Sequence, residues 1–116
     1  MFSKSELNVH MRKITLGEFE ELVLLTVAVM NSDAYGAAIT TDIAERTKRP
    51  VQVSAVHMAL YRLEEKGLLK SRMGGATSER GGRRKRLFTI TTLGIKVLED
   101  IRGIREQLWS LMPKPI

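Results

Sequence analysis

The sequence contains no cysteine, and its only imidazoles are those of His10 and His57. Without cysteine the chain has no disulfide framework, no thiolate metal ligand and no thiol nucleophile, which excludes thiol redox chemistry and is typical of a reducing compartment. Two histidines without cysteine also make a poor transition-metal site. We therefore expect a protein that uses no metal and no other cofactor.

Long apolar runs are missing as well. The longest extends from Leu22 to Met30 with one threonine inside it, whereas a helix needs roughly 20 apolar residues to cross a bilayer. Residues 1–15 alternate polar and apolar side chains and lack the continuous apolar stretch of a signal peptide. These absences predict a cytoplasmic protein without a membrane span.

Positive charge is present and is concentrated in one segment. The 116 residues include 19 Lys and Arg against 13 Asp and Glu, which gives a net charge of +6. Between positions 70 and 86 the one anion is Glu79, and the cations are Lys70, Arg72, Arg80, Arg83, Arg84, Lys85 and Arg86. This segment therefore carries the whole surplus. Cations gathered in this way can neutralise several phosphates together.

Turn-forming residues divide the first half of the chain into helical segments. Residues 16–30 are apolar on nearly every side after an acidic first turn, so this helix should be buried. A second helix is expected over residues 35–47. A third is expected over residues 55–66, with Ser54 as its N-cap and Gly67 as the left-handed residue that ends it.

The third helix is amphipathic at a spacing of about 100° per residue. The side that should pack into a core carries Val56, Ala59, Leu60 and Leu63. The side that should face outward carries Ser54, Met58, Tyr61, Arg62 and Glu65, with His57 at its edge.

The spacing of apolar residues changes after this helix. Residues 68–73 and 84–90 are expected to form a two-stranded hairpin around a polar, glycine-rich loop. Thr91 and Thr92 then cap a last helix that continues to about Met112. The predicted fold is mainly α with a small β-hairpin, a winged helix-turn-helix. Its expected parts are an N-terminal arm or short helix (1–15), the winged domain (16–90) and a C-terminal dimerisation helix (91–116).

A helix beside a basic hairpin suits duplex DNA. A helix is about 10–12 Å across and the major groove about 12 Å wide, and a flanking loop can reach neighbouring phosphates. Arg62 is the expected guanine reader, Ser54 a backbone contact and His57 a phosphate contact. The predicted DNA-binding residues are Ser54, His57, Met58, Tyr61, Arg62, Arg80, Arg83, Arg84, Lys85 and Arg86. The alternatives are a solvated helix face and an edge strand made soluble by its charge.

An enzyme is not expected. Ser54 and His57 could share a helix face, but the sequence places no carboxylate to orient the histidine and no oxyanion loop beside them.

The last helix carries a regular apolar seam. Val97, Ile101, Ile104, Leu108 and Leu111 recur at steps of four, three, four and three, and Trp109 lies beside them. The helix could fold back on its own core, but the seam favours pairing with a second copy. Such a homodimer would set two recognition helices about one DNA turn apart. Trp109 would pack in the interface or line a pocket for a small apolar or aromatic effector.

The order of these segments resembles the PadR family of bacterial transcriptional regulators. The residues that carry the resemblance are Leu16-Gly17, Ala34-Tyr35-Gly36, residues 56–69 and residues 86–94. The resemblance implies a homodimer whose C-terminal helices pack against the partner. It also implies a near-palindromic operator and repression that a small, often aromatic ligand relieves.

The chain departs from this family pattern in two respects. His57 stands where the family often has a tyrosine, and a single C-terminal helix places the chain with the short subgroup. We interpret Tyr35 as a core residue at the start of the second helix and not as a ligand contact.

Together these features predict a sequence-specific DNA-binding repressor that acts as a homodimer. One rival is a winged-helix adaptor whose basic hairpin contacts an acidic protein partner, and another is binding of structured RNA by the same hairpin.

Overall fold

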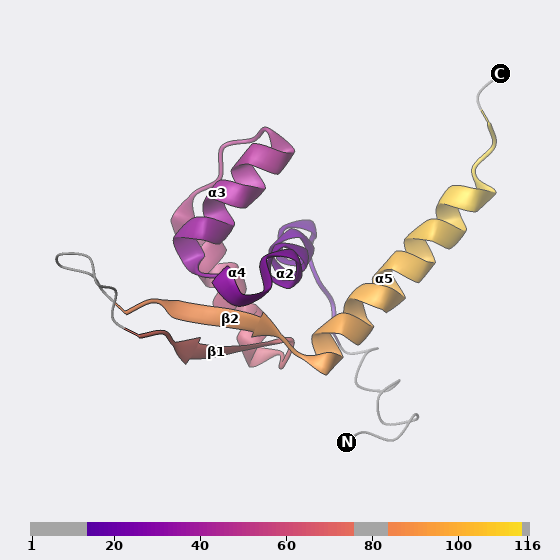
Figure 1. The fold of residues 1–116 in the computed structure, drawn as a ribbon. Coiled ribbons are helices and arrows are strands. Elements are labelled where there is room, and N and C mark those ends of the chain that lie inside the picture. Colours follow the sequence, from indigo (N-terminus) through magenta and orange to yellow (C-terminus); the bar gives the residue numbers. More distant parts are fainter. Residues whose placement is uncertain (1–13, 76–83, 115–116) are drawn as a thin grey trace.

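The structure is a computed structural model that describes residues 14–75 and 84–114. Its elements in chain order are α2 (Glu18–Met30), η1 (Asn31–Asp33), α3 (Gly36–Thr47), α4 (Val53–Glu65), β1 (Leu69–Met73), β2 (Arg86–Ile90) and α5 (Thr92–Leu111). Helices α2, α3 and α4 group together, the hairpin reaches out along one side, and α5 extends away from them (Figure 1). The predicted helical fold with a small hairpin is confirmed. Most of the predicted N-terminal arm lies outside the described residues.

Helix α2 is the centre of the bundle. Its acidic first turn suits the positive end of the helix dipole, and the Glu20 carboxylate accepts the Gly17 backbone N–H at 3.4 Å. Leu24 on its inner face is completely buried, whereas Leu25 and Val29 are 41% and 65% exposed. The prediction of a helix buried on nearly every side is therefore wrong, because one face of α2 carries these exposed side chains. Helix α5 extends away from the bundle and does not cover the length of α2 (Figure 1).

Helices α3 and α4 form the helix-turn-helix. Lys48 ends α3 in the left-handed region with φ 57°, and Pro50 in the turn prevents the helix from continuing. The predicted N-cap Ser54 is wrong by two positions, since Val53 is the first residue of α4 and Gln52 caps it without a side-chain bond.

The apolar side of α4 enters the core as predicted. Its buried residues are Val56, Ala59, Leu60 and Leu63. Each large aliphatic side chain buried there contributes roughly 2 kcal/mol through the hydrophobic effect.

The hairpin is joined to the helices at its base and along β2. Its strands are antiparallel, with Leu69 opposite Ile90, and Gly67 takes the predicted left-handed turn at φ 79° before β1. The Phe88 N–H donates to the Ala34 carbonyl at 2.8 Å, so the segment before α3 lies against the outer side of β2.

Helix α5 begins against the hairpin and then leaves the core. The Thr91 hydroxyl accepts the Gly94 N–H at 3.0 Å, which confirms the predicted cap. A Cβ at Gly94 would overlap the Leu68 carbonyl oxygen, so this glycine permits a close crossing. Val97 is only 4% exposed and belongs to the core of its own chain, which corrects its assignment to a dimer seam. In the described part of the chain, no helix combines the length and apolarity required to span a membrane.

Candidate nucleic-acid interface

The predicted recognition face of α4 is solvent-exposed along its whole length. It comprises Ser54, His57, Met58, Tyr61 and Arg62, which we call the recognition face. Met58 is 53% exposed and Tyr61 63% exposed, although both are large side chains with apolar surface. Since the opposite side of α4 is fixed in the core, these side chains project from a rigid support and are available to a macromolecule.

The loop end of the hairpin presents three consecutive cations of the basic segment, just before and at the start of β2. Arg84, Lys85 and Arg86 are all exposed, and none of them pairs with an acid among residues 14–75 and 84–114. Arg80 and Arg83, also predicted to bind DNA, lie outside the described residues. Arg84, Lys85 and Arg86 therefore form a positive surface that lacks an internal counter-charge in the described ranges.

Two of these arginines also hold the hairpin together, which the sequence did not indicate. The Arg84 Nε donates to the Gly74 carbonyl at 2.9 Å, and an Arg86 guanidinium nitrogen donates to the Ser71 hydroxyl at 3.0 Å. Ser71 in turn donates to the Glu64 carboxylate at 2.6 Å. Glu64, Ser71 and Arg86 thus connect the last turn of α4 to both strands of the hairpin. No local pattern links these positions, because strand pairing brings them together.

Tyr35 is not the core residue that the sequence predicted. It caps α3, is half-buried, and has the Lys85 ammonium 4.1 Å from the centre of its ring. This distance is within the range of a cation–π interaction. Tyr35 was misread because an aromatic residue at a helix start looks apolar in sequence, whereas the folded hairpin brings a cation to its face.

Ion pairs between distant segments fix the frame behind this surface. The Lys66 ammonium contacts the Glu20 carboxylate at 3.0 Å and the Thr15 carbonyl at 2.8 Å. Arg105 of α5 contacts Glu21 of α2 at 2.8 Å. Elsewhere on α5, the hydrogen bond to Glu106 at 2.7 Å raises the pKa of the exposed Arg102 guanidinium. The acidic residues Glu20 and Glu21 therefore hold other segments of the chain against α2 through ion pairs.

An apolar surface lies far from the recognition face, on the outer half of α5. Ile104, Leu108 and Leu111 are 53%, 60% and 70% exposed and continue the stripe that begins at Val97. Trp109 is 70% exposed and borders a groove of about 490 Å³ between α2 and α5. The predicted pairing surface is thus open along its outer half.

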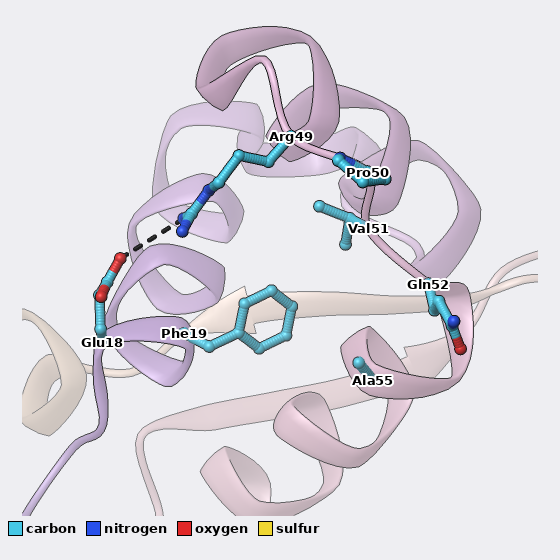
Figure 2. A pocket seen from close by; sticks show the side chains of 7 residues that line it. All are labelled: Glu18, Phe19, Arg49, Pro50, Val51, Gln52 and Ala55. Atoms are coloured by element: carbon cyan, nitrogen blue, oxygen red, sulfur yellow. Dashed lines mark hydrogen bonds and ion pairs between the residues drawn. The ribbon is translucent and has the colours of Figure 1, made fainter.

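A second groove, of about 410 Å³, lies between the start of α2 and the turn that precedes α4. Figure 2 shows Phe19 and Val51 at its centre and Glu18 and Arg49 joined across its opening, at 3.4 Å. Its lining holds no serine, histidine or tyrosine.

The remaining enzymatic interpretations gain no support from the geometry. Within the described ranges, no carboxylate is hydrogen-bonded to His57, although Ser54 and His57 share the exposed side of α4. The same ranges contain no cluster of three or more histidine, aspartate or glutamate residues that could hold a metal.

A core of three helices with an antiparallel hairpin after the third helix defines a winged helix-turn-helix protein. The family model of the transcriptional regulator PadR-like family matches residues 24–100, and the chain belongs to this family. Its members are transcriptional regulators.

Solved structures of this family share the fold. A PadR family regulator from Clostridium difficile is 27% identical, with a TM-score of 0.63, over 79% of this chain and 93% of that one. A regulator from Eggerthella lenta is 25% identical, with a TM-score of 0.62, over 80% of each chain. Bacillus subtilis PadR, solved with operator DNA, is 18% identical, with a TM-score of 0.61, over 88% of this chain and 51% of that one. No curated protein matches the chain.

Proposed function

We propose that this protein is a sequence-specific DNA-binding repressor that binds a near-palindromic operator as a homodimer. The observation that carries the proposal is the exposed recognition face of α4 beside three cations without a described acidic partner. This arrangement suits a helix in the major groove with a basic hairpin on the adjacent backbone. Bacillus subtilis PadR bound to operator DNA provides a precedent within the fold.

The proposed division of labour follows from side-chain chemistry. Arg62 can donate two hydrogen bonds to a guanine edge, while Met58 and Tyr61 offer apolar surface to thymine methyl groups. Ser54 and His57 lie near the start of α4 and are assigned to the DNA backbone. Lys85, Arg84 and Arg86 are assigned to phosphates, as point charges that position the protein without reading sequence.

A second copy of the chain is the proposed occupant of the apolar surface on α5. Ile104, Leu108 and Leu111 would lose their contact with water if two outer halves packed together, as a seam of this spacing favours. A twofold axis between the copies would repeat the recognition face, which explains why the operator should be near-palindromic.

The deciding experiment is selection of bound duplexes from a random pool at about 150 mM salt, where nonspecific electrostatic binding is already weakened. Enrichment of an inverted repeat is the expected result. A folded protein that enriches no duplex but retains an acidic protein partner would instead establish the adaptor function. If structured RNA competes for the protein as well as duplex DNA does, the result would support the RNA-binding alternative.

The small apolar or aromatic effector stays a prediction. The groove beside Trp109 has a volume of about 490 Å³ and is lined partly by Leu25, Ile95 and Leu98. Ligand pockets of drug-like molecules occupy about 300–1,000 Å³. Quenching of Trp109 fluorescence by a flat aromatic compound, with release of the selected duplex, is the measurement that tests it.

A further inference from the structure

Three consecutive residues lie where the helix-turn-helix meets the hairpin. The Ala34 carbonyl accepts the Phe88 N–H at 2.8 Å, in the middle of β2. The Tyr35 ring lies under the Lys85 ammonium, just before β2. Gly36 lies against the imidazole of His57 on α4. The segment 34–36 therefore contacts the recognition helix and the hairpin at the same time.

The contact at Gly36 depends on the absence of a side chain. A Cβ added there would overlap Cε1 of His57 and lie 3.0 and 3.1 Å from its two ring nitrogens. Gly36 is buried, is the first residue of α3, and is not among the residues with positive φ. Its backbone conformation is therefore open to any residue. A side chain at position 36 would therefore displace the exposed His57 ring from its place against α3.

The two ends of α4 are attached to the hairpin in different ways. Its last turn is connected through Glu64 and Ser71 to Arg86, as described above. His57 lies in the first half of α4, and Lys85 precedes β2. Tyr35 and Gly36 hold one of these residues each and are neighbours in the chain. One short segment at the start of α3 therefore contacts both a residue of the recognition helix and a cation of the hairpin.

We propose that Tyr35 and Gly36 are positioning residues that set the placement of the recognition helix relative to the hairpin, so that His57 and Lys85 meet one DNA duplex together. This role rests on the proposed function, because it concerns affinity for DNA. Neither Tyr35 nor Gly36 was among the predicted DNA-binding residues. Their effect is exerted through His57 and Lys85.

The first test is a double-mutant cycle between Gly36 and His57. Binding is measured by fluorescence anisotropy to the duplex enriched in the selection and to a random duplex pool of equal length. Gly36→Ala is expected to weaken binding to the enriched duplex about tenfold, the loss that corresponds to one well-placed contact. In a His57→Ala background, which removes the ring, the same substitution should change affinity less than about twofold.

Gly17→Ala is the matched control for this cycle. Gly17 also lies at the start of a helix, but a Cβ there would meet nothing within 4 Å. Binding by this variant should remain within about twofold of wild type. Circular dichroism and thermal unfolding confirm that each variant is folded.

The second test concerns Tyr35 and remains available if Gly36→Ala does not fold. Tyr35→Leu removes the aromatic face from Lys85 and should weaken binding to both duplexes about two- to fivefold, the size of an exposed cation–π interaction. Tyr35→Phe keeps the ring and should restore binding. In a Lys85→Ala background, Tyr35→Leu should have no further effect on affinity.

A measurement without DNA tests the contact itself. An NMR cross-peak between the Hε1 proton of His57 and an Hα proton of Gly36 is expected in the free protein, and its absence would overturn the proposal. The proposal would also be overturned if Gly36→Ala weakened DNA binding equally in the wild-type and in the His57→Ala background. If the wild type binds no duplex, the proposed function fails and this role with it, whereas the cross-peak would still report the contact.

Discussion

The inner and outer halves of α5 carry one apolar stripe but have different environments. Val97 is 4% exposed and Ile101 is half-buried against the core, whereas Leu108 and Leu111 are 60% and 70% exposed. The spacing of the residues is the same throughout. Periodicity therefore identifies the apolar face of a helix but does not determine whether the chain itself or another molecule covers that face.

The exposed outer half of α5 also differs from the exposed face of α4. On α5 the exposed Leu108, Trp109 and Leu111 are apolar, and the nearby Arg102 and Arg105 are paired with glutamates. On α4 the apolar Met58 and Tyr61 instead lie beside Arg62, which pairs with no acid in the described part of the chain. Apolar surface alone suits a second protein surface, and apolar surface with cations suits a nucleic acid. Mutations on α5 are therefore expected to disrupt pairing of two copies, whereas mutations on α4 are expected to disrupt DNA binding without affecting pairing.

The largest expected effect is on pairing. Leu108→Asp places a charge in the proposed interface and should yield a folded monomer that binds the selected duplex about a hundredfold more weakly, because two linked half-sites become independent. Sedimentation and anisotropy measure the two effects. Ser110→Asp adds the same charge on the opposite side of α5 and should leave the protein dimeric. A dimer that survives Leu108→Asp would refute the proposed interface.

The recognition face should respond differently from the hairpin. Arg62→Ala removes the proposed guanine contact and should weaken binding to the enriched duplex by about 1–3 kcal/mol, with little effect on random DNA. Removing Arg84 and Arg86 together should weaken binding to all duplexes and reduce the salt dependence. Anisotropy at several salt concentrations separates these outcomes. If both variants lose specific and random binding equally, the division of labour is wrong.

Mutations in the inner half of α5 should lower the stability of the fold. Val97→Ala leaves a cavity in the core and should lower the free energy of unfolding by about 2 kcal/mol. In the monomeric Leu108→Asp background, Leu111→Ala should change it by less than about 0.5 kcal/mol, since Leu111 is exposed. Urea denaturation followed by circular dichroism measures both. Similar losses at the two positions would contradict the distinction between the halves.

The smallest expected effect is the difference in stability lost when two ion pairs of α2 are broken. Lys66→Met breaks the partly buried pair with Glu20, in which the side chains are 31% and 14% exposed, and should cost about 1 kcal/mol. Arg49→Ala breaks the exposed pair with Glu18 and should cost less than about 0.5 kcal/mol. Urea denaturation distinguishes the two, and a reversed order would show that the contact to Glu20 does not stabilise the frame.

Several elements were predictable because their signals are local. The buried face of α4 follows from helical spacing, the turn at Gly67 follows from its position after a helix, and the cap at Thr91 follows from its hydroxyl. The errors also concern local choices. Ser54 is a good N-cap by residue type, but α4 begins at Val53 and its N-cap is Gln52, which makes no side-chain cap hydrogen bond.

The sequence by itself determined the class of fold, which side of α4 is exposed and the concentration of positive charge in the hairpin segment, since each depends on residues close together in the chain. Only the tertiary structure decided that Tyr35 supports Lys85, that Gly36 accommodates His57, and that Val97 belongs to the core. These three facts join residues that are distant in sequence. They depend on how strands pair and helices cross, which the pattern of a single segment does not specify.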